Sequence, residues 1–86
     1  MDRLSIPLNL LPVGCTARVK EIKAKGNIRR RMLDLGLVTG TEIEAVLRSP
    51  SGDPVAYHIR GAVIAFRSDE ASGVLVEPTK KLRQWR

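Results

Sequence analysis

Aromatic side chains are scarce in this chain of 86 residues, which holds one Tyr, one Phe and one Trp. A groove that binds proline-rich peptides is lined by aromatic rings, and a surface for single-stranded nucleic acid offers rings on which bases stack. Here Tyr57 and Phe66 fall on the expected inward face of strands, and Trp85 lies near the C-terminus. The sequence therefore argues against both binding functions and predicts an aliphatic core.

Cysteine is equally rare, because Cys15 is the single thiol and no internal disulfide can form. A chain of this length buries only roughly 60–65% of the surface that it exposes when unfolded, so we expect a filled core without a ligand cavity. The apolar stretch at residues 6–13 is interrupted by Pro7, Asn9 and Pro12, which is untypical of a signal peptide or a membrane span. These features predict a cytoplasmic protein.

Positive charge is unevenly distributed along the chain. Residues 1–79 hold 11 Lys or Arg and 9 Asp or Glu, whereas the last seven residues hold four basic residues and no acidic one. Most of the net charge of +6 therefore belongs to the C-terminus. We divide the chain into a domain at residues 1–77 and a basic tail at residues 78–86. A solvated end is the simplest interpretation of the tail, and contact with nucleic acid or an anionic membrane surface is the alternative.

Residues that build catalytic, cofactor or metal sites are few or scattered. The nine carboxylates lie on expected strands and turns without pairing, and neither GxxxxGK[ST] nor GxGxxG occurs. A structural zinc site needs several Cys or His at fixed spacing, whereas this chain has only Cys15 and His58. We expect no enzyme, no cofactor and no metal site. A metal-responsive module in which Cys15 and His58 converge is the alternative.

Hydrophobic periodicity predicts five short strands and one helix. The helix follows the first strand, with Asn27 as its N-cap, Gly36 as a left-handed C-terminal cap and Leu37 folding back on the last turn. The first strand should carry a bulge near Lys20 or Glu21, where the alternation slips. In the second strand, Ile43, Ala45 and Leu47 should face inward. The strands are expected at residues 15–23, 41–48, 55–60, 62–67 and 74–76.

Short strands at a spacing of 8–12 residues favour a β-rich fold, a small SH3-like barrel of about five strands with one helix inserted after the first strand. Residues 32–38 hold more apolar side chains than one helix needs to cover so small a barrel. A contiguous exposed apolar patch on a small domain marks a partner site. We therefore predict a partner-binding surface made by Arg30, Arg31, Met32, Leu33, Leu37 and Val38, with a fully core role for the apolar members as the alternative.

Several stretches of the chain, taken in order, resemble the FeoA family of ferrous iron transport protein A. The likeness covers about residues 8–77. It is carried by RRRMLDLGL at residues 29–37, GTEIE at residues 40–44 and SPSGDPV at residues 49–55. Shorter pieces agree with it, namely Leu8-x-x-Leu11-x-x-Gly14, IRG at residues 59–61, IAFR at residues 64–67 and EA at residues 70–71.

The resemblance implies an SH3-like domain that is accessory to bacterial ferrous iron uptake. Its expected partner is ferrous iron transport protein B, a membrane permease with a cytosolic GTP-binding domain. The chain would then meet the membrane only through that partner, bind no nucleic acid and be a monomer or a weak homo-oligomer. A basic nucleic-acid-binding barrel remains the alternative, and it would use Arg29, Arg30, Arg31, Lys80, Lys81 and Arg83.

Overall fold

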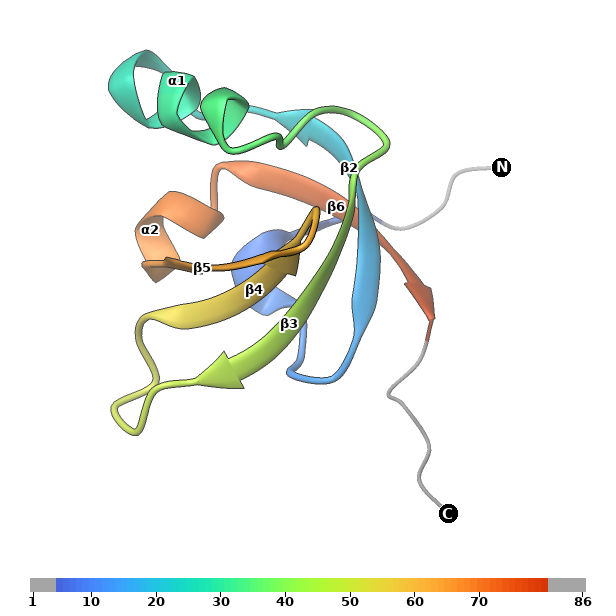
Figure 1. Cartoon of the computed structure of the whole chain (residues 1–86), viewed down its shortest axis with the longest axis vertical. Coiled ribbons are helices and arrows are strands. Elements are labelled where there is room, and N and C mark those ends of the chain that lie inside the picture. The colour runs from blue at the N-terminus through green and yellow to red at the C-terminus, as the bar shows by residue number, and fades with distance from the viewer. Residues whose placement is uncertain (1–4, 81–86) are drawn as a thin grey trace.

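The computed structural model describes residues 5–80, which form one antiparallel sheet with a helix at one end (Figure 1). The strand order in the sheet is β1-β6-β2-β3-β4-β5. Within these residues no helix is both long enough and apolar enough to cross a membrane. The elements are β1 (Ile6–Pro7), the 3-10 helix η1 (Leu8–Leu10), β2 (Thr16–Ile22), α1 (Gly26–Asp34), β3 (Glu42–Arg48), β4 (Val55–Ile59), β5 (Ala62–Phe66), α2 (Ser68–Ala71) and β6 (Val74–Lys80).

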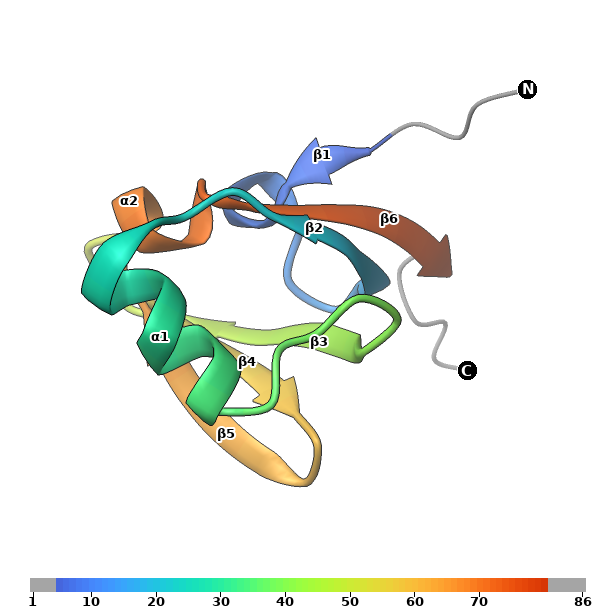
Figure 2. The ribbon, with the colours of Figure 1, turned by 90° about the horizontal axis from the view of Figure 1, so that it is seen from above.

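The sheet folds over on itself into two sides. Seen from above, β1, β6 and β2 lie on one side and β3, β4 and β5 on the other, with α1 across the gap between them (Figure 2). The predicted β-rich fold with one principal helix is confirmed. Two details differ, because residues 5–80 form six strands and α1 follows the second of them. β1 has only two residues, too few for any alternation to indicate a strand.

The core between the two sides is aliphatic apart from Tyr57 and Phe66, whose ring centroids lie 6.1 Å apart. Each fully buried aliphatic side chain contributes roughly 1.5–3 kcal/mol. Burial also raises the pKa of Tyr57, and its hydroxyl lies 3.5 Å from the Leu8 carbonyl oxygen, to which it donates. The aliphatic core residues are Leu8, Leu11, Ala17, Val19, Met32, Leu37, Ile43, Ala45, Val55, Ile59, Ala71, Val74 and Val76.

Irregularities in strand pairing decide which side chains reach this core. The register between β2 and β6 shifts between Val19 and Glu21, which confirms the predicted bulge. Further shifts, between Thr16 and Ala17 in β2 and between Ala45 and Leu47 in β3, were not predicted. One extra residue in a strand moves the following side chain to the opposite face. The prediction that Leu47 faces inward is therefore wrong, and 65% of its surface is exposed.

The C-terminus of α1 closes as the sequence predicts. Gly36 has φ +97° and donates to the Leu33 carbonyl at 3.0 Å, while Leu37 donates to the Met32 carbonyl at 3.0 Å. These two bonds form a Schellman motif, in which the residue after the glycine packs against the last turn. Met32 and Leu37 are both fully buried. The motif therefore turns the chain out of α1 and anchors it in the core at the same point.

The start of α1 differs from its prediction. The helix begins at Gly26, with Lys25 as the N-cap and no hydrogen bond from a capping side chain. Gly26 has φ +65°, so the chain reverses one residue earlier than expected. The prediction of Asn27 as the N-cap is wrong, because Asn27 lies within the first turn.

Gly36→Ala is expected to lower the free energy of unfolding by about 1–2 kcal/mol, because a left-handed conformation strains an L-residue. A Cβ at this position would also lie 2.6 Å from Cδ of Arg60. Gly40→Ala is a matched control, since Gly40 has φ +95° and no atom within 4 Å of the added Cβ. In urea unfolding, Gly36→Ala should cost more than Gly40→Ala. Equal costs in the two variants would contradict a role for the Arg60 contact.

The predicted tail begins inside the last strand. Pro78 pairs with Ala17, and the Oγ1 atoms of Thr16 and Thr79 share a hydrogen bond at 3.1 Å. β6 therefore continues three residues past the predicted end of the domain, up to Lys80. The division at residue 77 stays a prediction, and Trp85 lies outside the described residues.

Candidate functional site

The surface predicted from residues 30–38 separates into buried and exposed members. Met32 and Leu37 are fully buried, so a partner cannot contact them on the folded domain, and they leave the predicted set. Leu33 and Val38 are exposed at 42% and 47% of their surface. Because Leu33 lies three residues after Arg30, these two side chains share one face of the helix. We call Arg30, Arg31, Leu33 and Val38 the α1 surface, whose binding role stays a prediction.

Arg31 fixes α1 to the rest of the domain. Its guanidinium donates to Oε2 of Glu70 at 2.9 Å and lies 5.4 Å from the centroid of the Phe66 ring. The other carboxylate oxygen of Glu70, Oε1, accepts the backbone N–H of Arg67 at 3.0 Å. Glu70 therefore caps α2 and holds Arg31 at the same time. The hydrogen bond from the backbone N–H of Arg67 is the main cause that lowers the pKa of Glu70, and Arg31 lowers this pKa further.

Glu70→Gln is expected to destabilise the domain at neutral pH by less than about 1 kcal/mol, because the pair with Arg31 is partly exposed. Since folding lowers the pKa of Glu70 below its ordinary value of 4.5, the carboxylate stabilises the fold above that pH. This contribution disappears as the pH falls through the lowered pKa. Urea unfolding of both proteins at pH 7 and at pH 3 should show a smaller difference at pH 3 than at pH 7. The same difference at both pH values would contradict this account.

The other two arginines of the triplet have different surroundings. Arg29 donates to the Ile22 carbonyl oxygen at 2.7 Å, which ties the start of α1 to the end of β2. Arg30 is exposed, and among residues 5–80 it makes no hydrogen bond or ion pair. The Arg30 guanidinium therefore has no bonding partner among the described residues, and a binding partner can reach it.

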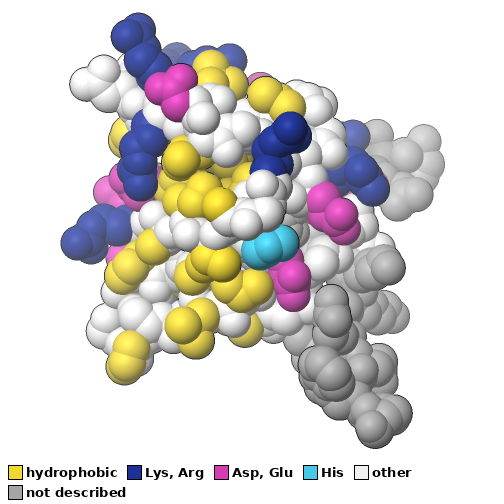
Figure 3. Space-filling view, viewed as in Figure 1, with side chains coloured by type: hydrophobic (Ala, Val, Ile, Leu, Met, Phe, Trp, Pro, Cys, Tyr) yellow, Lys and Arg dark blue, Asp and Glu magenta, His cyan; other side chains and the backbone are white. Residues whose placement is uncertain are grey.

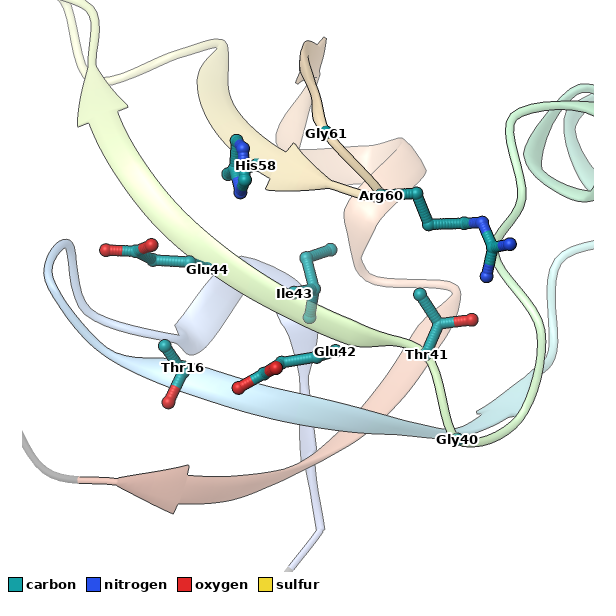
Figure 4. Close-up of a pocket in the computed structure, with 9 residues that line it drawn as sticks. All are labelled: Thr16, Gly40, Thr41, Glu42, Ile43, Glu44, His58, Arg60 and Gly61. Carbon is teal, nitrogen blue, oxygen red and sulfur yellow. The ribbon is translucent and has the colours of Figure 1, made fainter.

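His58 and Cys15 lie in different settings. His58 lines an open depression of 540 Å³ (Figure 4), beside Glu44, its cross-strand partner on β3. Arg60 points away from the carboxylates, towards the loop after α1 (Figure 4). Cys15 is half-buried and does not line this depression. Within the described residues, no group of three or more His, Cys, Asp and Glu side chains is arranged to hold a metal ion.

The strongest surface feature that the sequence did not indicate is on the β4–β5 hairpin. Apolar side chains gather over these strands and towards α1, and Lys and Arg side chains lie around them (Figure 3). Val63 is 64% exposed, and Ala62 and Ala65 are exposed as well. A single outward valine on a strand is ordinary by itself. Its significance depends on the position of β5 at the edge of the sheet, which the sequence pattern does not reveal.

Comparisons with known proteins agree with this architecture. The FeoA domain family matches residues 6–78 of the chain. A FeoA-like protein from Clostridium acetobutylicum superposes with a TM-score of 0.85 at 33% identity, over 99% of this chain and 98% of that one. FeoA from Stenotrophomonas maltophilia, solved with zinc and described as a prokaryotic SH3 domain protein, gives 0.74 at 32% identity, over 81% and 87% of the two chains. The SH3-like fold predicted from the sequence is confirmed.

A longer relative is a fusion of Fe(2+) transport protein A with the Fe(2+) transporter FeoB in Porphyromonas gingivalis. The two sequences are 33% identical over 70 residues, which is 81% of this chain. The chain spans 8% of the length of that curated relative.

Proposed function

The chain belongs to the FeoA family, and from this premise we propose that it is a cytoplasmic, non-enzymatic accessory protein of bacterial ferrous iron uptake that binds the transporter FeoB. The contact is made through the α1 surface. The observation that carries the proposal is the combination on one helix face of exposed Leu33 and exposed Arg30, neither of which belongs to the buried core.

The composition of the α1 surface supports a protein partner. Exposed aliphatic side chains beside arginine are typical of interface centres, where Arg is enriched and Lys is depleted. Arg31 is held in place by Glu70 and Phe66, so its guanidinium is ordered before any partner arrives. A side chain that is already ordered loses less conformational entropy on binding. The partner surface should be apolar at its centre and acidic at its rim.

The fusion in Porphyromonas gingivalis supports FeoB as that partner. In the fusion, a FeoA-like segment and the transporter belong to one chain, which keeps the two at high effective concentration. A separate chain such as this one has to reach the transporter by affinity alone. A docked domain changes the activity of a transporter only by the difference between its affinities for two states of that transporter.

The experiment that tests the proposed function is a binding titration of the chain with the cytosolic part of FeoB, with and without guanine nucleotide. Saturable binding whose affinity depends on the nucleotide is the expected result. No binding under either condition would contradict the proposal.

A further inference from the structure

β5 (Ala62–Phe66) is an edge strand. It is the last strand in the sheet order and pairs with β4 on one side, and β1, at the other end of the order, pairs with β6. An edge strand presents unpaired N–H and C=O groups, to which another extended segment can add as a further strand. The backbone of β5 is therefore a potential binding element, independent of its side chains.

The β4–β5 turn shows which groups face the free edge. Arg60 has φ +50° and Gly61 has φ +86°, the two positive values of a two-residue type I′ hairpin. Ile59 and Ala62, which flank this turn, form a hydrogen-bonded pair, and the pattern alternates from there. Ile64 thus bonds to β4, whereas the N–H and C=O groups of Val63 and Ala65 point outward. Among residues 5–80, none of these four groups donates or accepts a hydrogen bond.

Nothing within β5 protects this edge. Native proteins protect exposed edges with charged residues, proline or bulges, but β5 reads Ala-Val-Ile-Ala-Phe and pairs with β4 in a continuous register. Near the two ends of β5, Arg31 of α1 lies over the Phe66 ring, and Gly36 in the loop after α1 lies against Arg60. We propose that the free edge of β5 binds an extended, acid-flanked peptide segment of a partner protein as a seventh strand.

Positive charges at the two ends of β5 favour acidic residues at the two ends of the added segment. The edge lies between Arg60 at the turn and Arg67 after Phe66, both of them exposed. At the Phe66 end, Arg31 is already paired with Glu70 at 2.9 Å. Arg67 lies 4.0 Å from Asp53, but 69% of its side-chain surface is exposed, so Arg60 and Arg67 are the charges that the flanks of a partner strand would meet. Opposite charges directly across a strand pair are favourable and like charges are unfavourable. Acidic residues at both ends of the added strand therefore fit, with small or β-branched residues between them to cover Val63.

The same charges disfavour a second copy of this chain as the occupant. Antiparallel pairing of two β5 strands around Ile64 would bring Arg67 of each copy next to the Arg60–Gly61 turn of the other. Parallel pairing would place Arg60 beside Arg60. Either arrangement repeats a like-charge contact, whereas an acid-flanked segment turns each of these contacts into an attractive one.

This inference deepens the proposed function by naming the kind of segment that the domain binds. Its test uses peptides, so that its result does not depend on whether FeoB binds. The probe is a synthetic seven-residue peptide with Asp at both ends and alternating Thr and Val between them. The same peptide with Lys at both ends is the charge control. Amide hydrogen exchange of the full chain is followed by NMR as each peptide is added.

The acid-flanked peptide should slow exchange at Val63 and Ala65 by at least about tenfold at saturation, since each amide gains a hydrogen bond. Exchange at Ile64 should change little, because that amide is already bonded to β4. The lysine-flanked peptide should bind at least about tenfold more weakly. Failure of the acid-flanked peptide to bind, or binding without slower exchange at Val63 and Ala65, would overturn the inference. So would slower exchange at both amides on raising the concentration of the protein alone, because the occupant would then be a second copy.

Ala65→Pro supplies a variant that tests the backbone directly. Proline is tolerated on an edge strand where its missing N–H would face outward, so the variant should remain folded while losing one bond to the peptide. We expect about tenfold weaker binding of the acid-flanked peptide. Ile64→Pro is the matched control, because it removes a bond to β4 and should lower the melting temperature. Unchanged peptide affinity in a folded Ala65→Pro protein would also overturn the inference.

Discussion

Replacing Leu37 by alanine is expected to lower the free energy of unfolding by about 2–5 kcal/mol. Leu37 is fully buried and follows Gly36 in the Schellman motif, where it packs with Met32 beneath the last turn of α1. Truncation leaves a cavity at the point where the helix is anchored to the sheet. Because a small domain has only about 5–15 kcal/mol of stability in total, Leu37→Asp should leave the chain unfolded. Urea denaturation followed by circular dichroism measures both effects.

Val38→Ala is the matched control for this prediction. Val38 is the next residue in the chain but is 47% exposed, and surface substitutions usually change stability by no more than about 0.5 kcal/mol. The contrast between neighbours is what the structure predicts. A loss below about 1 kcal/mol in Leu37→Ala, or equal losses in the two variants, would show that α1 is not anchored at Leu37.

Leu33→Asp is expected to weaken binding to the cytosolic part of FeoB by at least about tenfold while the domain stays folded. The substitution removes an apolar contact and places a carboxylate in the interface, where the charge would have to be desolvated without a partner. Leu33 is 42% exposed on the folded domain, so the substitution removes little of the core. Isothermal titration gives the affinity, and a thermal melt of the same sample shows that the fold is retained.

Leu10→Asp controls for the substitution itself. Leu10 is an exposed leucine on η1, outside the α1 surface, so the same change there should leave the affinity within about twofold. Arg30→Glu should act in the same direction as Leu33→Asp, because the partner rim is expected to be acidic. If Leu33→Asp binds as tightly as the unchanged chain while remaining folded, the contact with FeoB lies elsewhere on the domain.

Leu33 and Leu37 show why the sequence could not tell the buried residues of 30–38 from the exposed ones. The chain there holds five apolar residues, more than one helix face can bury. Spacing alone does not say which of them the sheet covers. Met32 and Leu37 are buried because the turn at Gly36 brings Leu37 back under the helix. Leu33 and Val38 are left outside by the same turn. The sequence shows that residues 30–38 hold more apolar side chains than the core can take, but it does not show which of them are exposed.

The strands also show what the alternation of apolar and polar residues can and cannot predict. Alternation located β2 to β5 and their inward residues, since a side-chain period of two follows directly from strand geometry. It placed Leu47 on the wrong face, because Ala45, Val46 and Leu47 are all apolar and the bulge there causes no slip in the alternation, unlike the bulge in β2. It also could not find β1, whose two residues form a strand only because Val76 and Leu75 lie beside them.

The sequence by itself determined the class of fold, the position of the helix and its glycine cap, and the membership of the FeoA family, since these depend on local patterns that each stretch carries alone. The tertiary structure decided which apolar side chains remain exposed, how Arg31 is held by Glu70 and Phe66, and that β5 ends the sheet with an unprotected edge. These features arise from contacts between segments distant in the chain, and no local pattern specifies which segments will meet.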